Sequence, residues 1–135
     1  MASNRLSIMG TRHVISAGHY LAAHAGFQVL EAGGNAIDAG VAAGIAIGVL
    51  QTDKVNFAGV APQIIYTARN RKVHCIDGLG VWPKAITPDY FQKKHGGLIP
   101  PGIERCVVPA APDAWLTALE NFGTMSFSDV ASHAI

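Results

Sequence analysis

Apolar residues recur at helical spacing through the first third of the chain. From Ser16 or Gly18 to Ala32 they fall every three or four positions, and the two glycines that follow are a typical helix stop. Asn35 is a favourable N-cap, because its side chain can accept hydrogen bonds from free backbone N–H groups. Residues 36–50 then contain no turn-forming residue except glycine. We therefore predict two consecutive helices, over 16 or 18 to 32 and over 36–50.

The second predicted helix carries a stripe without side chains. Gly40, Gly44 and Gly48 are spaced four residues apart and lie on one face of a helix. Each glycine costs a helix about 1 kcal/mol relative to alanine. Such a stripe is useful where another backbone comes very close, so we predict that this helix is clamped between neighbouring layers.

Alternating and branched residues predict a small amount of sheet. The runs over 60–67 and 72–76 are rich in branched side chains, and the polar turn Ala68–Arg71 between them is typical of a hairpin. The short apolar stretch Leu6–Met9 is compatible with an opening strand.

The second half of the chain predicts further helices separated by a long loop. The elements expected are a short helix over 88–95 with proline in its first turn, a proline- and glycine-rich loop over 96–106, an amphipathic helix over 113–122, and a last helix that is capped by Ser126 or Ser128 and still continues at Ile135. Helices and an antiparallel hairpin are thus segregated along the chain rather than alternating. This order predicts an α+β fold.

Composition suggests that part of the surface is covered by other protein. Half of the 135 residues are hydrophobic and only 14% are charged, which is more apolar than is usual for a solvated domain of this size. The chain also stops on the apolar residues Ala134 and Ile135, inside a predicted helix. We interpret residues 1–135 as one segment of a longer, truncated protein.

Net charge, the length of the apolar run and the N-terminal sequence argue in turn against nucleic acid, a membrane and secretion. A net charge of +1 creates no field that would gather nucleic acid, so no nucleic acid partner is expected. The apolar run over 36–50 is shorter than the roughly twenty residues that a bilayer requires, so no membrane association is expected either. The first sixteen residues lack the apolar core of a secretory signal, which favours a cytoplasmic location.

The residues that bind metals and cofactors show no recognisable pattern. None of the six histidines is paired with another ligand at a spacing typical of a metal site, and no dinucleotide-binding fingerprint is present. We therefore predict neither a metal nor a cofactor. Cys75 and Cys106 are far apart, and we expect them to be separate buried thiols.

One long segment resembles a known enzyme family. Residues 33–66, GGNAIDAGVAAGIAIGVLQTDKVNFAGVAPQIIY, are similar to the gamma-glutamyltransferase segment in which Gly-Gly-Asn-Ala-(Val/Ile)-Asp-Ala opens a small-residue helix. Residues 108–135, VPAAPDAWLTALENFGTMSFSDVASHAI, resemble the family's Val-Pro-Gly helix and the Phe-Gly turn after it. The similarity extends over nearly the whole chain.

The resemblance implies a specific architecture and chemistry. Members of the family have the αββα sandwich of N-terminal-nucleophile hydrolases and are made as a precursor that cuts itself into a large and a small subunit. A threonine at the new N-terminus attacks the amide of a small-molecule gamma-glutamyl donor. Residues 1–135 would then be the N-terminal segment of the large subunit. Its partners would be the rest of that subunit and the small subunit.

The resemblance also implies that no catalytic residue lies in this chain. The six threonines do not match the family's processing pattern, so the isolated chain is expected to be inactive; they are residues 11, 52, 67, 87, 117 and 124.

The substrate-binding position of the family is changed here. In members that bind glutamate, an arginine about two residues after the aspartate that corresponds to Asp77 pairs with the substrate carboxylate, and this position is Leu79. The family's oligoglycine turn is replaced by the bulkier residues Asn56–Ala61. These departures favour an acylase or amidohydrolase acting on a different amide, unless another cation such as Lys84 takes the place of the arginine.

Two other functions compete with an enzyme. A family member without the arginine could be a non-catalytic protein retained as a binding or assembly module. A small independent α+β binding domain is a further alternative, although the apolar end of the chain disfavours it.

Overall fold

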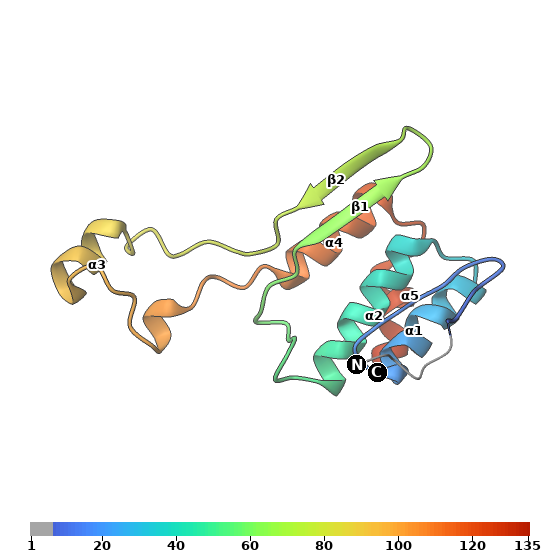
Figure 1. Cartoon of the computed structure of the whole chain (residues 1–135), viewed down its shortest axis with the longest axis horizontal. Coiled ribbons are helices and arrows are strands. Elements are labelled where there is room, and N and C mark those ends of the chain that lie inside the picture. Colours follow the sequence, from blue (N-terminus) through green and yellow to red (C-terminus); the bar gives the residue numbers. More distant parts are fainter. Residues whose placement is uncertain (1–6) are drawn as a thin grey trace.

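The computed structural model describes residues 7–135 and shows a helical body, a hairpin and an extended arm (Figure 1). The helices are α1 (Tyr20–Glu31), α2 (Ala36–Leu50), α3 (Pro88–His95), α4 (Ala111–Phe122) and α5 (Phe127–Ala131), with 3-10 turns η1 (Ile103–Arg105) and η2 (Ser132–Ala134); the strands are β1 (Gln63–Thr67) and β2 (Lys72–Ile76). We call residues 77–110 the arm and the remaining described residues the body. None of the helices in the described part is long and apolar enough to cross a membrane.

The first two helices form an antiparallel pair with an alanine-rich interface. α2 begins at its predicted residue because the Asn35 side chain accepts hydrogen bonds from the backbone of Ile37 and Asp38. The helices approach each other closely at Gly26, where an added Cβ would lie 2.7 Å from the carbonyl oxygen of Ala39. Small residues therefore allow α1 to lie directly on α2.

α4 and α5 complete the body by packing on the other side of α2. Trp115 and Leu119 of α4 and Val130 of α5 are buried together with Val29 and Ile45 of the helix pair. Burial of such side chains stabilises the fold by about 1.5–3 kcal/mol each. One continuous core thus joins segments from both ends of the chain.

A buried carboxylate ties the N-terminus of α2 to the turn between α4 and α5. Asp38 is 0% exposed and accepts hydrogen bonds from the backbone N–H of Asn35 at 2.8 Å, and from the backbone N–H and hydroxyl of Thr124 at 3.0 Å and 2.6 Å. Burial alone would raise the pKa of Asp38, but the hydrogen bonds from Thr124, Asn35 and Met125 together hold that pKa below its ordinary value. The carboxylate is therefore charged, and its hydrogen bonds join the start of α2 to the turn before α5.

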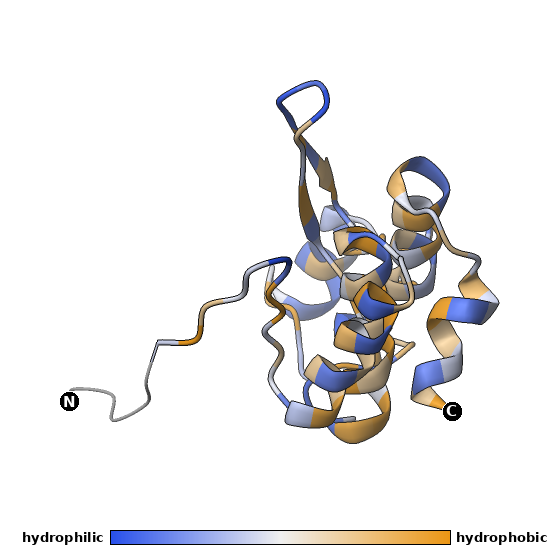
Figure 2. Ribbon diagram, turned by 90° about the vertical axis from the view of Figure 1, so that its right-hand side faces the viewer, coloured by the Kyte–Doolittle hydropathy of each residue, from blue (hydrophilic) through white to orange (hydrophobic). Residues whose placement is uncertain are grey.

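The hairpin lies over α4, with one face packed on the helices and one face free. The register pairs Ile65 with His74 on the inner face, where Ile65 is buried and the His74 ring lies 4.8 Å from the Phe122 ring. Ile64, Tyr66 and Val73 alternate with these residues and point outward, with Ile64 80% exposed. The hairpin projects beyond the helices with a hydrophilic turn and partly apolar strands (Figure 2).

The arm leaves the body after β2, carries α3 and η1 at its far end, and returns at α4 (Figure 1). Its tip has a single buried side chain, Phe91, which packs on the ring of Trp82 with 5.3 Å between centroids. α3 is joined to η1 by Glu104, whose carboxylate contacts Tyr90, Lys94 and His95. A small aromatic cluster and one charged network thus hold the tip together.

Glu104 is the centre of that network. The ammonium group of Lys94, the Tyr90 hydroxyl and the His95 ring donate to its two oxygens and lower the pKa of Glu104 to about 2. The hydrogen bonds that Lys94 donates to Glu104 and to the Tyr90 hydroxyl raise the pKa of Lys94 above its ordinary value. Because Lys94 is exposed and the other groups are only partly buried, their effect is expected to depend on salt and pH.

Several predictions about the elements are confirmed. α2 and α3 have their predicted bounds, the hairpin forms around the predicted turn, and Ser126 caps α5. The first predicted helix appears as α1, but it begins only at Tyr20 and ends at Glu31. The first strand begins at Gln63 rather than at residue 60, and α4 begins two residues earlier than predicted, with Pro112 in its first turn. The predicted loop over 96–106 contains the single 3-10 turn η1.

Other predictions about the fold are wrong. Residues 7–9 of the expected opening strand are not in a strand, because they have no partner strand among the described residues; Leu6 lies outside them. The last helix ends at Ala131 and continues only as the turn η2, so it does not run to Ile135. Cys75 and Cys106 are free thiols as expected, but both are exposed, because Cys75 points to the outer face of the hairpin and Cys106 lies on the arm.

Among residues 7–135, no other backbone lies tightly against the glycine stripe of α2, so the predicted clamp on this stripe is not present within the described part of the chain. An added Cβ would meet the Trp115 ring at Gly44, make only ordinary contacts at Gly48, and meet nothing within 4 Å at Gly40. The close backbone contact of this helix is instead made through Gly26 of α1. Within residues 7–135 the stripe is therefore partly open.

Candidate substrate-binding region

Three segments that are far apart in sequence meet at the N-terminus of α4. The carbonyl of Gly59 accepts hydrogen bonds from the backbone N–H groups of Ala110 and Ala111 at 3.3 Å and 3.2 Å. Ala61 donates to the carbonyl of Gly78 at 2.9 Å, and Val108 donates to Val81 at 2.8 Å. The turn over 56–61, the base of the arm and the start of α4 are therefore held in one place by their backbones.

This arrangement explains the two glycines that flank Leu79. Gly78 and Gly80 have φ angles of 56° and 79°, which side-chain-bearing residues rarely adopt. An added Cβ would also lie 2.3 Å from the Ala61 carbonyl oxygen at Gly78 and 2.0 Å from the Val108 carbonyl oxygen at Gly80. Both residues therefore shape the backbone, and their position fixes the direction of the residue between them.

Leu79 is presented at the surface by this rigid turn. Its side chain is 48% exposed, and the base of the arm beside it encloses a hollow of about 390 Å³ that Asp77, Gly78 and Gly80 line together with Asp113 of α4. Leu79 is not among the residues that line this hollow. Its apolar side chain is thus available to a ligand or to another part of the protein on the outside of the turn.

The turn over residues 56–61 packs on α4. Phe57 lies edge-on to Trp115 with 5.1 Å between ring centroids, and the N–H of Gly59 donates to the Asn56 carbonyl at 3.0 Å. Phe57 therefore anchors this turn by packing, where glycines would leave it free.

The three threonine hydroxyls with defined contacts among the described residues have structural roles. Thr124 donates to Asp38 at 2.6 Å, Thr87 accepts from the backbone N–H of Tyr90 at the start of α3, and Thr67 contacts the His74 ring at 3.1 Å. Each hydroxyl stabilises a helix end or the hairpin.

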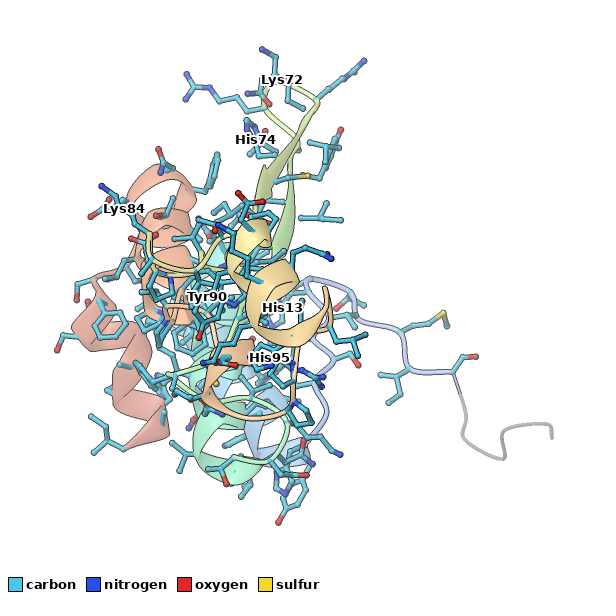
Figure 3. The ribbon with its side chains drawn as sticks, turned by 90° about the vertical axis from the view of Figure 1, so that its left-hand side faces the viewer. His13, Lys72, His74, Lys84, Tyr90 and His95 are labelled. Carbon is cyan, nitrogen blue, oxygen red and sulfur yellow. The ribbon has the colours of Figure 1, made fainter. Side chains whose placement is uncertain are left out.

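The imidazole and amine groups are spread over separate elements (Figure 3). His13 belongs to the N-terminal segment, where its ring contacts Glu31 at 3.0 Å, while His74 and Lys72 lie on the hairpin and His95 lies on α3. Lys84, the alternative cation, is exposed on the arm. Among residues 7–135, no three histidine, cysteine or acidic side chains are grouped so that they could hold a metal ion.

Sequence reasoning did not single out two residues whose buried polar groups stand out in the structure, Asp38 and Gln63. Asp38 resembles an ordinary acidic residue in the first turn of a helix, and its partner Thr124 is 86 residues away. Gln63 begins β1, and its side-chain nitrogen is buried without a hydrogen-bond partner among the described residues. The Asn-Ala-Ile-Asp capping pattern could have pointed to Asp38, whereas no local pattern distinguishes Gln63.

Sequence comparison finds curated relatives that match nearly the whole of this chain. The chain is 32% identical over 130 residues to the glutathione hydrolase-like YwrD proenzyme of Bacillus subtilis, covering 95% of this chain and 24% of that protein. It is 33% identical over 138 residues to an acylase ACY 1 proenzyme of a Pseudomonas strain, covering 93% of this chain and 24% of that protein. It therefore spans about a quarter of the length of these curated relatives.

Solved structures have the same fold. The crystal structure of Helicobacter pylori gamma-glutamyltranspeptidase superimposes with a TM-score of 0.83 at 28% identity, over 96% of this chain and 38% of that chain. The helices and hairpin are accordingly an α+β part of the αββα N-terminal-nucleophile hydrolase sandwich, as predicted. The family profile described as gamma-glutamyltranspeptidase matches residues 22–135. This chain belongs to the gamma-glutamyltranspeptidase family.

Proposed function

We propose that this chain is the N-terminal segment of the large subunit of a self-processing amide hydrolase or acyltransferase whose nucleophile lies outside residues 1–135. The relatives named proenzymes are about four times as long as the part that this chain matches, which supports this assignment. The outward hairpin face supports it too, because Ile64, Tyr66 and Val73 are exposed apolar side chains that the second sheet of a sandwich would cover.

The reaction of such an enzyme divides amide cleavage into two steps. The threonine oxygen forms a bond to the acyl carbon, the carbon–nitrogen bond breaks, and the amine leaves with a proton. Water or an acceptor amine then attacks the resulting ester and releases the threonine. The described residues supply none of these reacting groups, so their role is to build the wall of the substrate site.

We further propose that the acyl group is not a strict gamma-glutamyl group. The single observation that carries this proposal is Leu79, which a turn with two positive-φ glycines holds in a fixed place, where the family's glutamate-binding members have arginine. An apolar side chain cannot pair with a carboxylate, whereas a guanidinium can form two parallel hydrogen bonds to it. The acylase among the relatives is consistent with an acyl donor of another kind.

The experiment compares the full-length protein with its Leu79→Arg variant on a gamma-glutamyl anilide. We expect poor turnover by the native protein and an increase of several-fold to about a hundred-fold in kcat/KM for the variant, because a well-placed charge-assisted pair contributes roughly 1.5–3 kcal/mol. Leu79→Met is the matched control and should not improve turnover, since it keeps an apolar side chain of similar size.

Efficient native turnover of the anilide would contradict the substrate proposal and would indicate that another cation, such as Lys84, binds the carboxylate. A full-length protein that never cuts itself would contradict the enzymatic proposal and favour a binding or assembly role. The purified 135-residue chain should show no hydrolysis or transfer of the gamma-glutamyl group in the same assay.

A further inference from the structure

The turn of the hairpin carries three positive charges close together. We call residues 68–72 the hairpin tip; Arg69, Arg71 and Lys72 within it are all exposed. The tip projects beyond the helices as a hydrophilic loop, with Lys72 beside the turn (Figure 2, Figure 3). No aspartate or glutamate occurs from residue 54 to residue 76. The hairpin therefore has local positive charge even though the net charge of the whole chain is only +1.

These cations have no ionic partner among residues 7–135. The ion pairs in the described part of the chain are made by other residues, in the N-terminal segment, after α2 and at the end of the arm. Like charges this close in sequence repel one another, and an anionic group between them would replace this repulsion by attraction. The hairpin tip is therefore a surface to which negative charge would bind.

Arg71 occupies a backbone position that suits arginine poorly. Its φ is 56°, and it is the single residue other than glycine with a positive φ in the described part of the chain. Glycine and asparagine adopt this conformation at lower cost. Backbone conformations of this kind cluster at ligand-binding and other functional positions. A guanidinium in this place is therefore better explained by binding than by folding.

The backbone of the hairpin tip is fixed before any partner binds. The side-chain oxygen of Asn70 accepts a hydrogen bond from the backbone N–H of Lys72 at 3.1 Å and another from the Thr67 hydroxyl. Thr67 also contacts the His74 ring at 3.1 Å, and the strand pair of Thr67 with Lys72 closes the turn. A preformed turn lowers the cost of binding, because less conformational freedom is lost on association.

The shape of the hairpin tip favours a large partner over a small one. The hollows of about 230–530 Å³ in the described structure are lined by residues outside 68–72. Small ligands are usually enclosed by a concave site. A projecting turn is instead suited to contact with the surface of another macromolecule.

The amount of charge favours a protein as that partner. Nucleic acid and anionic bilayers present long arrays of negative charge, and the proteins that bind them carry correspondingly many basic residues. Three cations on one turn match a short run of carboxylates, and clustered arginines are a recurring means of recognising acidic motifs. Each guanidinium can also form two parallel hydrogen bonds to a carboxylate.

We propose that the hairpin tip is a docking site for an acidic segment of another protein, in which Arg69, Arg71 and Lys72 pair with neighbouring carboxylates. The hairpin tip and the turn around Leu79 lie at opposite ends of β2, so this site is separate from the candidate substrate-binding region. The proposal therefore goes beyond the proposed function and does not rest on it.

The first test measures binding of a fluorescent peptide with a run of glutamates to the full-length protein, by anisotropy at low salt. The peptide should bind, its glutamine counterpart should not, and the affinity should fall as salt is added. Arg69→Gln should weaken binding about two- to fivefold, and its combination with Arg71→Gln and Lys72→Gln should weaken it on the order of tenfold or more. Lys93→Gln is the matched control, because it removes one exposed charge from α3 and should leave the affinity unchanged.

Three outcomes of this test would overturn the proposal. They are failure of the full-length protein to bind the peptide, equal binding by the native protein and the triple variant, and tighter binding to phosphatidylserine vesicles or to a DNA oligonucleotide than to the peptide. The last outcome would identify another class of partner. None of these outcomes depends on self-processing or amide hydrolysis, so the proposed function is tested separately.

The second test separates binding from folding at Arg71. Arg71→Gly removes the guanidinium and relieves the positive-φ backbone, whereas Arg71→Gln removes the guanidinium alone. Both variants should weaken peptide binding to a similar extent, and only Arg71→Gly should slow hydrogen exchange of the hairpin amides, by several-fold, because its turn is more stable. Unchanged peptide binding in both variants, or exchange in Arg71→Gly that is as fast as in the native protein or faster, would overturn the proposal.

Discussion

The body and the arm of this protein are stabilised in different ways. The body buries Trp115, Val29 and Val130 from three helices in one core and uses the buried carboxylate of Asp38 to join its two halves. The arm buries a single side chain, Phe91, and is otherwise held by a partly exposed charged network around Glu104. We expect the body to unfold as one cooperative unit and the tip of the arm to open locally at much lower cost.

The largest effect should come from Asp38→Ala in the body. The change removes the buried acceptor for the backbone of Asn35 and for the backbone and hydroxyl of Thr124, and leaves these partly buried donors without it. We expect a loss of roughly 3 kcal/mol in the free energy of unfolding, measured by urea denaturation.

Asp129→Ala is the matched control for this prediction. Asp129 has the same capping-box geometry with Ser126 at the start of α5, but its hydrogen bonds are exposed, so the loss should be about 1 kcal/mol. Equal losses in the two variants would show that the buried link between the halves adds nothing to local capping.

A smaller effect is expected from Gly44→Leu. An added Cβ would already lie 3.2 Å from the indole nitrogen of Trp115, so the larger side chain must displace this ring and should destabilise the body by about 1–3 kcal/mol. In the 135-residue chain, the same substitution at Gly40 should stabilise by up to about 1 kcal/mol, since nothing is near and glycine disfavours a helix. Thermal melts of both variants compare the two sites, and stabilisation by Gly44→Leu would contradict the contact with Trp115.

Glu104→Gln should lower the stability of the arm and leave the stability of the body unchanged. The variant loses the charged network with Lys94 and His95, so exchange of the α3 amides should increase several-fold while the cooperative melting of the body stays the same. Asp89→Asn on the same helix has no partner in the network and serves as the control. A fall in the melting temperature of the body would show that the two regions are coupled.

Acidification should produce the smallest change in the arm. The pKa of Glu104 is lowered to about 2, so its contribution is complete above the ordinary glutamate pKa of about 4.3 and is lost as the pH falls through about 2. Exchange of α3, corrected for its intrinsic pH dependence, should therefore increase between about pH 4 and pH 2. The same increase in Glu104→Gln would show that another group is responsible.

Local sequence determined most of the secondary structure. Asn35 and the glycine-bounded apolar run specify α2, Pro88 begins α3, and the polar turn Ala68–Arg71 specifies the hairpin, because capping and turn chemistry act over a few residues. The family was also recognisable in the sequence, because residues 33–66 resemble the gamma-glutamyltransferase segment that opens with Gly-Gly-Asn-Ala-(Val/Ile)-Asp-Ala.

Tertiary structure alone decided which of these residues matter and to what they are joined. Asp38 is an ordinary capping residue until Thr124, 86 positions away, donates to it, and Gly26 rather than the glycines of α2 makes the close helix contact. The exposure of Leu79 depends on the backbone of Ala61 and Val108, which hold the turn around it. Contacts between distant segments depend on how the chain packs as a whole, and no pattern of neighbouring residues records that packing.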